Sequence, residues 1–135
     1  MQIDITNLEQ AVLTLKESQE ILSDNKNDIL TSVLEDAVIK RFEYTLEIAK
    51  KIMKKVLNKF YDKSETELTV NNIFRYMYGY DYISNWENWK IYHEKRNNTA
   101  HEYNLEKSRK LLEVVPNFIV DTEELITNLK EKLCC

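Results

Sequence analysis

The chain has 135 residues, 43% of them hydrophobic, which is enough apolar side chain for the core of one domain spanning residues 1–135. A single glycine and a single proline leave almost none of the turn residues that a β-protein needs, so the composition excludes an all-β fold and predicts an all-α one. The net charge of -4 and the pI of about 5.3 exclude a protein that coats nucleic acid by bulk charge.

The charge is unevenly distributed along the chain. Residues 1–36 carry eight acidic side chains against two lysines, whereas residues 40–60 carry two glutamates against seven basic side chains: Lys40, Arg41, Lys50, Lys51, Lys54, Lys55 and Lys59. A basic run of this kind is either a surface that meets an anionic partner or a solvated lysine face. The sequence leaves both alternatives open.

Cysteine usage and hydropathy bound the compartment. Cys134 and Cys135 are adjacent, so they cannot cross-link a fold and do not have the spacing of metal ligands. No apolar run approaches the roughly 20 residues of a membrane span, and the amino terminus lacks a basic segment followed by an apolar one. These features predict a cytoplasmic protein that does not enter a membrane.

Helical spacing of apolar residues predicts two long helices in the first half of the chain. The first covers about residues 7–22, with Thr6 as its N-cap and Glu9 completing a capping box. The second starts at an Asp28 cap and continues for about eight turns to Phe60, on the order of 45 Å. Its broad apolar stripe predicts contacts with its own subunit on one side and with a second copy, in a homodimer, on the other.

A short helix is expected next, starting at Thr69 or Asn71 and continuing through Met77, with Gly79 ending it in the left-handed conformation. Four tyrosines gather at this corner: Tyr76, Tyr78, Tyr80 and Tyr82. They either form a stacking platform for nucleic-acid bases or seal the end of a helical bundle, and their half-apolar character favours the second role.

Two further helices complete the predicted fold. Ser84 or Asn85 is the expected cap of a helix that carries both histidines, and Asn104 is the expected cap of the last helix, which Pro116 should kink. The predicted architecture is an all-α, up-and-down four-helix bundle with one short extra helix before the histidine-containing helix.

The histidine-containing helix has an unusual face. A helical arc of roughly 140° contains Trp86, Trp89, His93, Arg96, Asn97, Ala100 and His101. The face therefore begins as aromatic core and ends polar, either because that end reaches solvent or hydrogen-bonded partners, or because it forms a site. His93 is the weaker candidate: it lies two turns from His101, nothing nearby completes a zinc pattern, and no metal or cofactor is expected.

The string Arg96-Asn97-Asn98-Thr99-Ala100-His101 has the arginine, polar residue, three further residues and histidine of the HEPN superfamily, whose members are helical bundles and often ribonucleases. Residues 38–57, VIKRFEYTLEIAKKIMKKVL, resemble the RFEFTFELAWK helix of its HepT branch, the nucleotidyltransferase substrate-binding subfamily, which is encoded beside a minimal nucleotidyltransferase. The resemblance covers most of the chain in order. Lys50 departs from it, because the subfamily often has tryptophan there, and GYDYI replaces the usual Gly-Leu-Ile at the Gly79 corner.

The residue types suit RNA cleavage without a metal ion. His101 can move the proton of the ribose hydroxyl or of the leaving oxygen, and Arg96 can hold charge on the phosphorane. Asn97, one turn before His101, can orient the imidazole or bind the phosphate. The resemblance implies a composite site in which a two-fold axis brings two such strings together. It extends to Tyr103, since a tyrosine two residues after the histidine is where the HepT partner adds AMP.

Three functions are compatible with these features. The first, favoured because arginine, polar residue and histidine occur together, is a ribonuclease toxin of a toxin-antitoxin pair, neutralised when a minimal nucleotidyltransferase antitoxin adds AMP to Tyr103. The second is a non-catalytic nucleotidyltransferase substrate-binding subunit, in which Arg96 and His101 hold a nucleotide phosphate. The third is a purely structural helical dimer. The sequence does not indicate which RNA would be cut.

Overall fold

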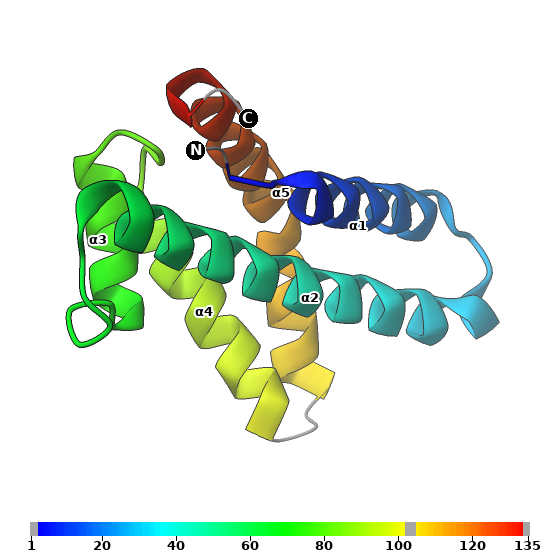
Figure 1. Ribbon diagram of the computed structural model, residues 1–135. Coiled ribbons are helices and arrows are strands. Elements are labelled where there is room, and N and C mark those ends of the chain that lie inside the picture. Colours follow the sequence, from blue (N-terminus) through cyan, green and yellow to red (C-terminus); the bar gives the residue numbers. More distant parts are fainter. Residues whose placement is uncertain (1–2, 102–104, 134–135) are drawn as a thin grey trace.

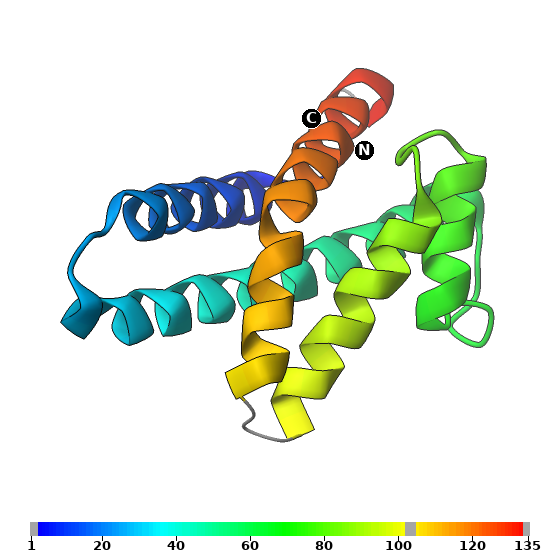
Figure 2. The same cartoon turned by 180° about the vertical axis from the view of Figure 1, so that it is seen from behind.

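The structure, a computed structural model, describes residues 3–101 and 105–133, with the backbone alone for residues 98–101 and 105–107. The described residues form five helices and no strand: α1 (Thr6–Asp24), α2 (Asp28–Tyr61), α3 (Val70–Gly79), α4 (Trp86–His101) and α5 (Leu105–Leu133). α1 runs back along α2, and α4 and α5 run side by side across it (Figures 1 and 2). The predicted helical class and helix order, with the short helix third, are confirmed.

The longest helix, α2, is the spine of the fold. Its 34 residues extend about 50 Å, and it packs against each of the other four helices. Its buried side chains lie between Val38 and Leu57. Its first two turns instead leave Ile29, Leu30 and Val33 exposed. The second apolar face predicted for this helix is therefore seen mainly at its amino-terminal end.

A cluster of aromatic rings locks α4 onto α2 and α5. The Phe118 ring of α5 meets Phe42 of α2 at 4.7 Å and meets Tyr92 and Trp89 of α4 at 5.1 and 5.6 Å, all edge to face. The Tyr92 hydroxyl donates a hydrogen bond of 2.5 Å to Asp121, and burial together with this carboxylate raises the pKa of Tyr92 well above its ordinary value. Because these rings are buried, they fix how α4 is rotated about its axis.

The caps differ from the sequence prediction at the first two helices. Ile5 occupies the N-cap position of α1 and makes no side-chain cap bond, so the predicted capping box of Thr6 and Glu9 is wrong. Asp4 takes over instead, since its carboxylate accepts from the Thr6 N–H at 2.9 Å. At α2 the cap is Asn27, whose side-chain oxygen accepts from the Ile29 N–H, one residue earlier than predicted.

The caps of the next two helices follow the prediction. The Thr69 hydroxyl accepts from the Asn72 N–H at the start of α3, and the Asn85 side chain accepts from the Asn88 N–H, at 3.0 Å, before α4. The Asn104 cap predicted for α5 lies outside the described residues. α5 continues as one helix through Pro116, and Figure 2 shows that it changes direction part-way along, as a proline within a helix predicts.

The end of α3 shows why Gly79 is not needed in the left-handed conformation. Its φ is not positive; the left-handed residue is Asp81, with φ 65°. The Asp81 N–H bonds to the Tyr78 carbonyl and the Tyr82 N–H to the Met77 carbonyl, which is the bond pattern of a Schellman motif. Aspartate tolerates this conformation better than most residues, so Asp81 takes the place predicted for Gly79. The left-handed turn therefore lies two residues later than predicted.

The tyrosines of this corner mainly seal the bundle. Tyr82 is fully buried, and its hydroxyl lies 2.8 Å from that of Tyr61. The Tyr80 ring stacks on Tyr61 with centroids 3.9 Å apart. Tyr78 remains largely exposed.

None of the described helices is long and apolar enough to span a membrane.

Candidate functional site

The carboxyl-terminal half of α4 faces α2 with polar side chains. Trp89 is completely buried, and Arg96 lies seven residues further on, within about 20° of the same direction around the helix. The Arg96 side chain therefore reaches α2, where its Nε lies 3.3 Å from Oε1 of Glu47 in an ion pair. Its Nε is buried, whereas 29% of the side chain as a whole is exposed, so part of this arginine is accessible from outside.

The Glu47 carboxylate is shared by two cations. The same Oε1 lies 2.9 Å from Nζ of Lys50, one turn further along α2. Partial burial favours the protonated form of Glu47, but the hydrogen bond from Lys50 and the charges of Lys50 and Arg96 outweigh it and lower its pKa. Glu47 is thus a carboxylate at neutral pH and links the two helices.

His93 completes this arrangement between Lys50 and Asn97. Its Nδ1 lies 3.2 Å from the Lys50 ammonium, and its Nε2 lies 3.1 Å from the Asn97 amide nitrogen. Burial lowers the pKa of His93, and the positive charge of Lys50 lowers it further. The ring is therefore neutral and accepts from Lys50 at Nδ1, which leaves the hydrogen on Nε2. The Nε2–H then donates to Asn97, which requires the amide to be flipped so that its oxygen, not its nitrogen, faces the ring.

We call these five side chains the α2–α4 polar cluster: Glu47, Lys50, His93, Arg96 and Asn97. With His93 neutral, it holds two cations on one anion and carries an excess positive charge. A phosphate could replace or share the carboxylate at the guanidinium, whose planar donors suit a phosphate group. The cluster can therefore bind an oxyanion and stabilise charge that develops on it.

The structure brings together some of the residues predicted from sequence. Arg96 and Asn97 lie in the cluster, and Asn97 contacts His93. His101 is the last residue of α4, one turn beyond Asn97, but its side chain is outside the described residues. Tyr103 also lies outside them, so the roles predicted for His101 and Tyr103 stay predictions.

Sequence reasoning missed two members of the cluster and undervalued a third. Glu47 and Lys50 come from a different helix, although both lie in the segment that resembles the HepT helix. The signal available in the sequence was the spacing of these two polar residues, three apart on α2 beside its buried apolar side chains. His93, considered the weaker histidine, has described partners on both ring nitrogens. In the described part of the chain, no group of three or more histidine, cysteine or acidic residues could hold a metal ion.

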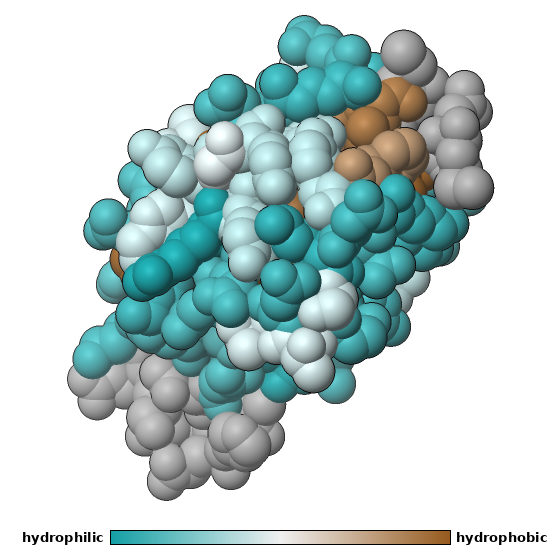
Figure 3. Space-filling view, turned by 60° about the vertical axis from the view of Figure 1, so that its left-hand side comes forward, coloured by the Kyte–Doolittle hydropathy of each residue, from teal (hydrophilic) through white to brown (hydrophobic). Residues whose placement is uncertain are grey.

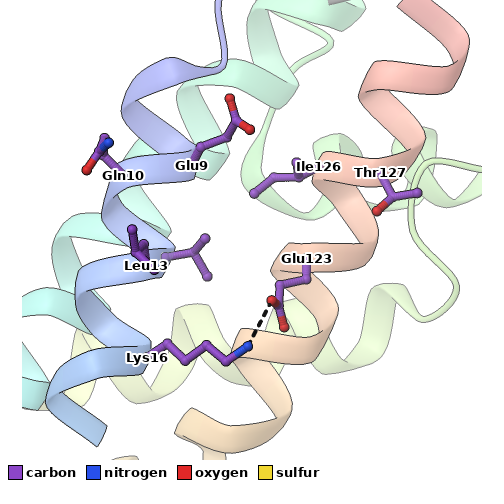
Figure 4. Close-up of a pocket in the computed structure, with 8 residues that line it drawn as sticks. Glu9, Gln10, Leu13, Lys16, Glu123, Ile126 and Thr127 are labelled. Carbon is purple, nitrogen blue, oxygen red and sulfur yellow. Dashed lines mark hydrogen bonds and ion pairs between the residues drawn. The ribbon is translucent and has the colours of Figure 1, made fainter. Parts of the chain in front are cut away.

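A hollow with a volume of about 410 Å³ lies apart from this cluster, between α1 and α5 (Figure 4). Lys16 extends across it from α1 to Glu123 of α5, at 3.4 Å. A further ion pair joins Glu9 to Lys130, at 2.8 Å. This hollow shares no residue with the α2–α4 polar cluster, and its two carboxylates make it a poor place for a phosphate.

The chain belongs to the family described as nucleotidyltransferase substrate binding protein like, whose model matches residues 3–131. It is 24% identical, over 139 aligned positions, to a protein of Haemophilus influenzae named probable ribonuclease HepT. That alignment covers 96% of this chain and 94% of the relative.

Solved structures share the fold. One, from Haemophilus influenzae, is described as the fold of a substrate binding domain of a nucleotidyltransferase; the TM-score is 0.83 and the identity 22%, over 94% of this chain and 99% of that one. A crystal structure from Thermus thermophilus matches with a TM-score of 0.76 and 22% identity, over 91% of this chain and 98% of the other. At these identities the likeness establishes the helical fold.

The neutral state of His93 predicts a pH-dependent stability. Because its pKa is lowered in the folded protein, the unfolded chain takes up the proton first as the pH falls through about 6.5. The free energy of unfolding should therefore decrease from pH 7 toward lower pH, and His93→Gln should make this decrease smaller. Urea unfolding at several pH values measures both slopes.

The parent protein and the His93→Gln variant share every other titrating group, so the difference between their slopes isolates His93. Equal slopes for the two proteins would show that the folded state tolerates a charged His93, contrary to the contacts described.

Proposed function

We propose that this chain is a HEPN ribonuclease toxin of a toxin-antitoxin pair, an endoribonuclease neutralised by a minimal nucleotidyltransferase that adds AMP to it. Membership of the nucleotidyltransferase substrate-binding family and a relative named probable ribonuclease HepT support the proposal. So does the string from Arg96 to His101, which has the spacing of the HEPN motif. RNA and the nucleotidyltransferase are the expected partners.

The observation that carries the proposal is the position of Arg96. Its guanidinium is tethered to Glu47 on α2, partly exposed, on the same helix as the motif histidine. An arginine held in this way loses little further side-chain freedom when it grips a phosphate. This is the pre-organisation that charge stabilisation in a transition state requires.

The chemistry assigns different steps to the two motif residues. A base withdraws the proton of the ribose 2′-hydroxyl as its oxygen attacks the phosphorus, and an acid gives a proton to the departing 5′-oxygen. The products are a cyclic phosphate and a free 5′-hydroxyl. We assign proton transfer to His101 and stabilisation of the phosphorane to Arg96, with Asn97 in a supporting role. These side chains need no metal ion for that step.

Replacing either residue should abolish RNA cleavage and growth inhibition, because the two act on different atoms and cannot substitute for each other. For Arg96→Ala and His101→Ala, cleavage is measured by incubating total RNA with the purified protein, and toxicity is measured as growth after induced expression. Arg75→Ala is the matched control: it removes an exposed arginine that lies over the Trp86 ring, outside the cluster, and should leave cleavage intact.

Circular dichroism should show the same helix content in all three variants. If both motif variants cleaved RNA like the parent in a nuclease-free preparation, the ribonuclease proposal would be wrong. The second candidate function would then stand: a non-catalytic subunit that presents a nucleotide or phosphate to a nucleotidyltransferase, which the family description favours.

Neutralisation is proposed to be covalent and to take place at Tyr103. AMP attached to its hydroxyl would place a phosphodiester anion two residues from His101, where it would compete with RNA phosphate for the Arg96 guanidinium. Co-expression with the nucleotidyltransferase should add the mass of one AMP group to a peptide containing Tyr103 and should suppress cleavage. Intact-mass and peptide analysis measure the change.

The Tyr103→Phe variant is the control for that experiment, since it lacks only the hydroxyl. It should remain toxic in the presence of the partner. Suppression of toxicity with an unmodified Tyr103 would contradict the covalent mechanism and leave binding as the antidote.

We also propose that the functional unit is a homodimer. The exposed apolar side chains at the start of α2, Ile29 and Val33 among them, support this because water-exposed apolar patches are typical of interfaces. Sedimentation at micromolar concentration should show a dimer. Val33→Asp should weaken it, whereas Val120→Asp, at an equally exposed position on α5, should not. A monomer in the parent protein would contradict the proposal.

A further inference from the structure

A groove beside the α2–α4 polar cluster has no role in the chemistry above. Its volume is about 200 Å³, and Lys50, Lys51 and Lys54 line it from α2. Glu47 lines it as well, so the groove adjoins the carboxylate that holds Arg96. The opposite wall is formed by Leu68, Val70 and Ile73, from the end of the α2–α3 connection and the first turn of α3.

The two walls differ in chemistry. In the apolar wall, Leu68 and Ile73 are only 6% and 4% exposed, so the core holds these side chains firmly in place. The lysine wall is positive: Lys50 pairs with Glu47, and Lys54 pairs with Glu65 at 2.6 Å. Lys51 is exposed and makes no ion pair with any described residue. Figure 3, which brings the α3 side forward, shows a mainly hydrophilic face whose largest apolar patch lies toward one edge.

An apolar wall opposite a row of ammonium groups suits one nucleotide of an RNA strand. The groove is smaller than the roughly 300 Å³ of pockets that enclose drug-sized ligands, so it suits one flat base rather than a whole dinucleotide. Lys51 and Lys54 are one helical turn apart, with Cβ atoms about 5–6 Å from each other, and can therefore meet neighbouring backbone phosphates. The net charge of the chain is -4, so a polyanion needs such a local positive site.

We propose that this groove is an RNA subsite, which holds the nucleotide next to the phosphate gripped by Arg96. The base lies on the Leu68 and Ile73 side, and Lys51 and Lys54 hold the backbone. An aliphatic wall makes no base-specific hydrogen bond. The subsite therefore contributes affinity and positions the strand along the site, and it does not select a base. This inference rests on RNA being the ligand of the proposed function.

The test measures RNA binding without cleavage. Full-length protein carrying His101→Ala is titrated into fluorescent single-stranded oligoribonucleotides of increasing length, and anisotropy is followed at several salt concentrations. Adding Lys51→Gln and Lys54→Gln should weaken binding and lower the slope of log Kd against log salt by about 1.4, the value for two phosphate contacts on a single strand. Lys59→Gln, on an exposed lysine of the same helix outside the groove, is the matched control and should leave the slope unchanged.

Separate arms distinguish the possible ligands. Affinity that rises with RNA length, and that falls in the double variant, supports the subsite. AMP binding as tightly as the longer oligomers would overturn it in favour of a mononucleotide site. RNA binding that is unchanged in the double variant, or undetectable in the parent, would also overturn it. So would a double variant that loses binding to the nucleotidyltransferase but keeps binding to RNA.

The outcome separates this inference from the proposed function. With His101 restored, the double variant should raise KM for RNA and leave kcat close to that of the parent. A protein that binds RNA through these lysines but cleaves none would retain the subsite and refute the ribonuclease. A protein that cleaves RNA with an unaltered KM in the double variant would refute the subsite and retain the ribonuclease.

Discussion

The aromatic contacts of Phe118 are the interaction on which the rest of this structure depends. They pin Trp89 and Tyr92 of α4 against α2 and α5, and edge-to-face rings of this kind tolerate little rotation. Because a helix rotates as a unit, fixing its apolar half also fixes the direction of every later residue. Arg96 therefore reaches Glu47 on α2 without any loop to guide it. The polar cluster is placed by core packing two turns away.

Much of the fold could be predicted from the sequence, because helix order depends on the local spacing of apolar residues. The relation between helices could not, since periodicity defines a face of one helix but not its partner. The partnership of Arg96 with Glu47 is therefore visible only in the structure. The wrong capping box at Thr6 and the left-handed conformation expected at Gly79 have a related cause. At the start of α1, the Asp4 carboxylate accepts from the backbone N–H that the predicted capping box would have bonded. At the end of α3, Asp81 adopts the left-handed conformation and the turn satisfies the last carbonyls.

The basic run along α2 has a different meaning at each position. Lys50 is mostly buried and bonded to a carboxylate and an imidazole, which makes it part of the scaffold that holds α4. Lys51, its neighbour in sequence, is exposed and lines the same groove. It takes no part in the contacts with Glu47 and His93, which Lys50 makes. Counting charges in a segment cannot separate these cases. Ammonium groups one residue apart on a helix face in directions that differ by about 100°, so one can be structural and the next available to a ligand.

The position of Glu47 makes anion binding at Arg96 an exchange rather than a simple addition. The guanidinium already rests on an internal counterion, so an incoming phosphate gains only the difference between its own attraction and that of the carboxylate. Monovalent ions such as chloride offer too little charge and too few acceptors to displace it. When a bound anion leaves, the carboxylate is there to take back the guanidinium, which favours release. An internal counterion of this kind lowers the affinity for every anion and favours those that carry enough charge and enough acceptors to replace it.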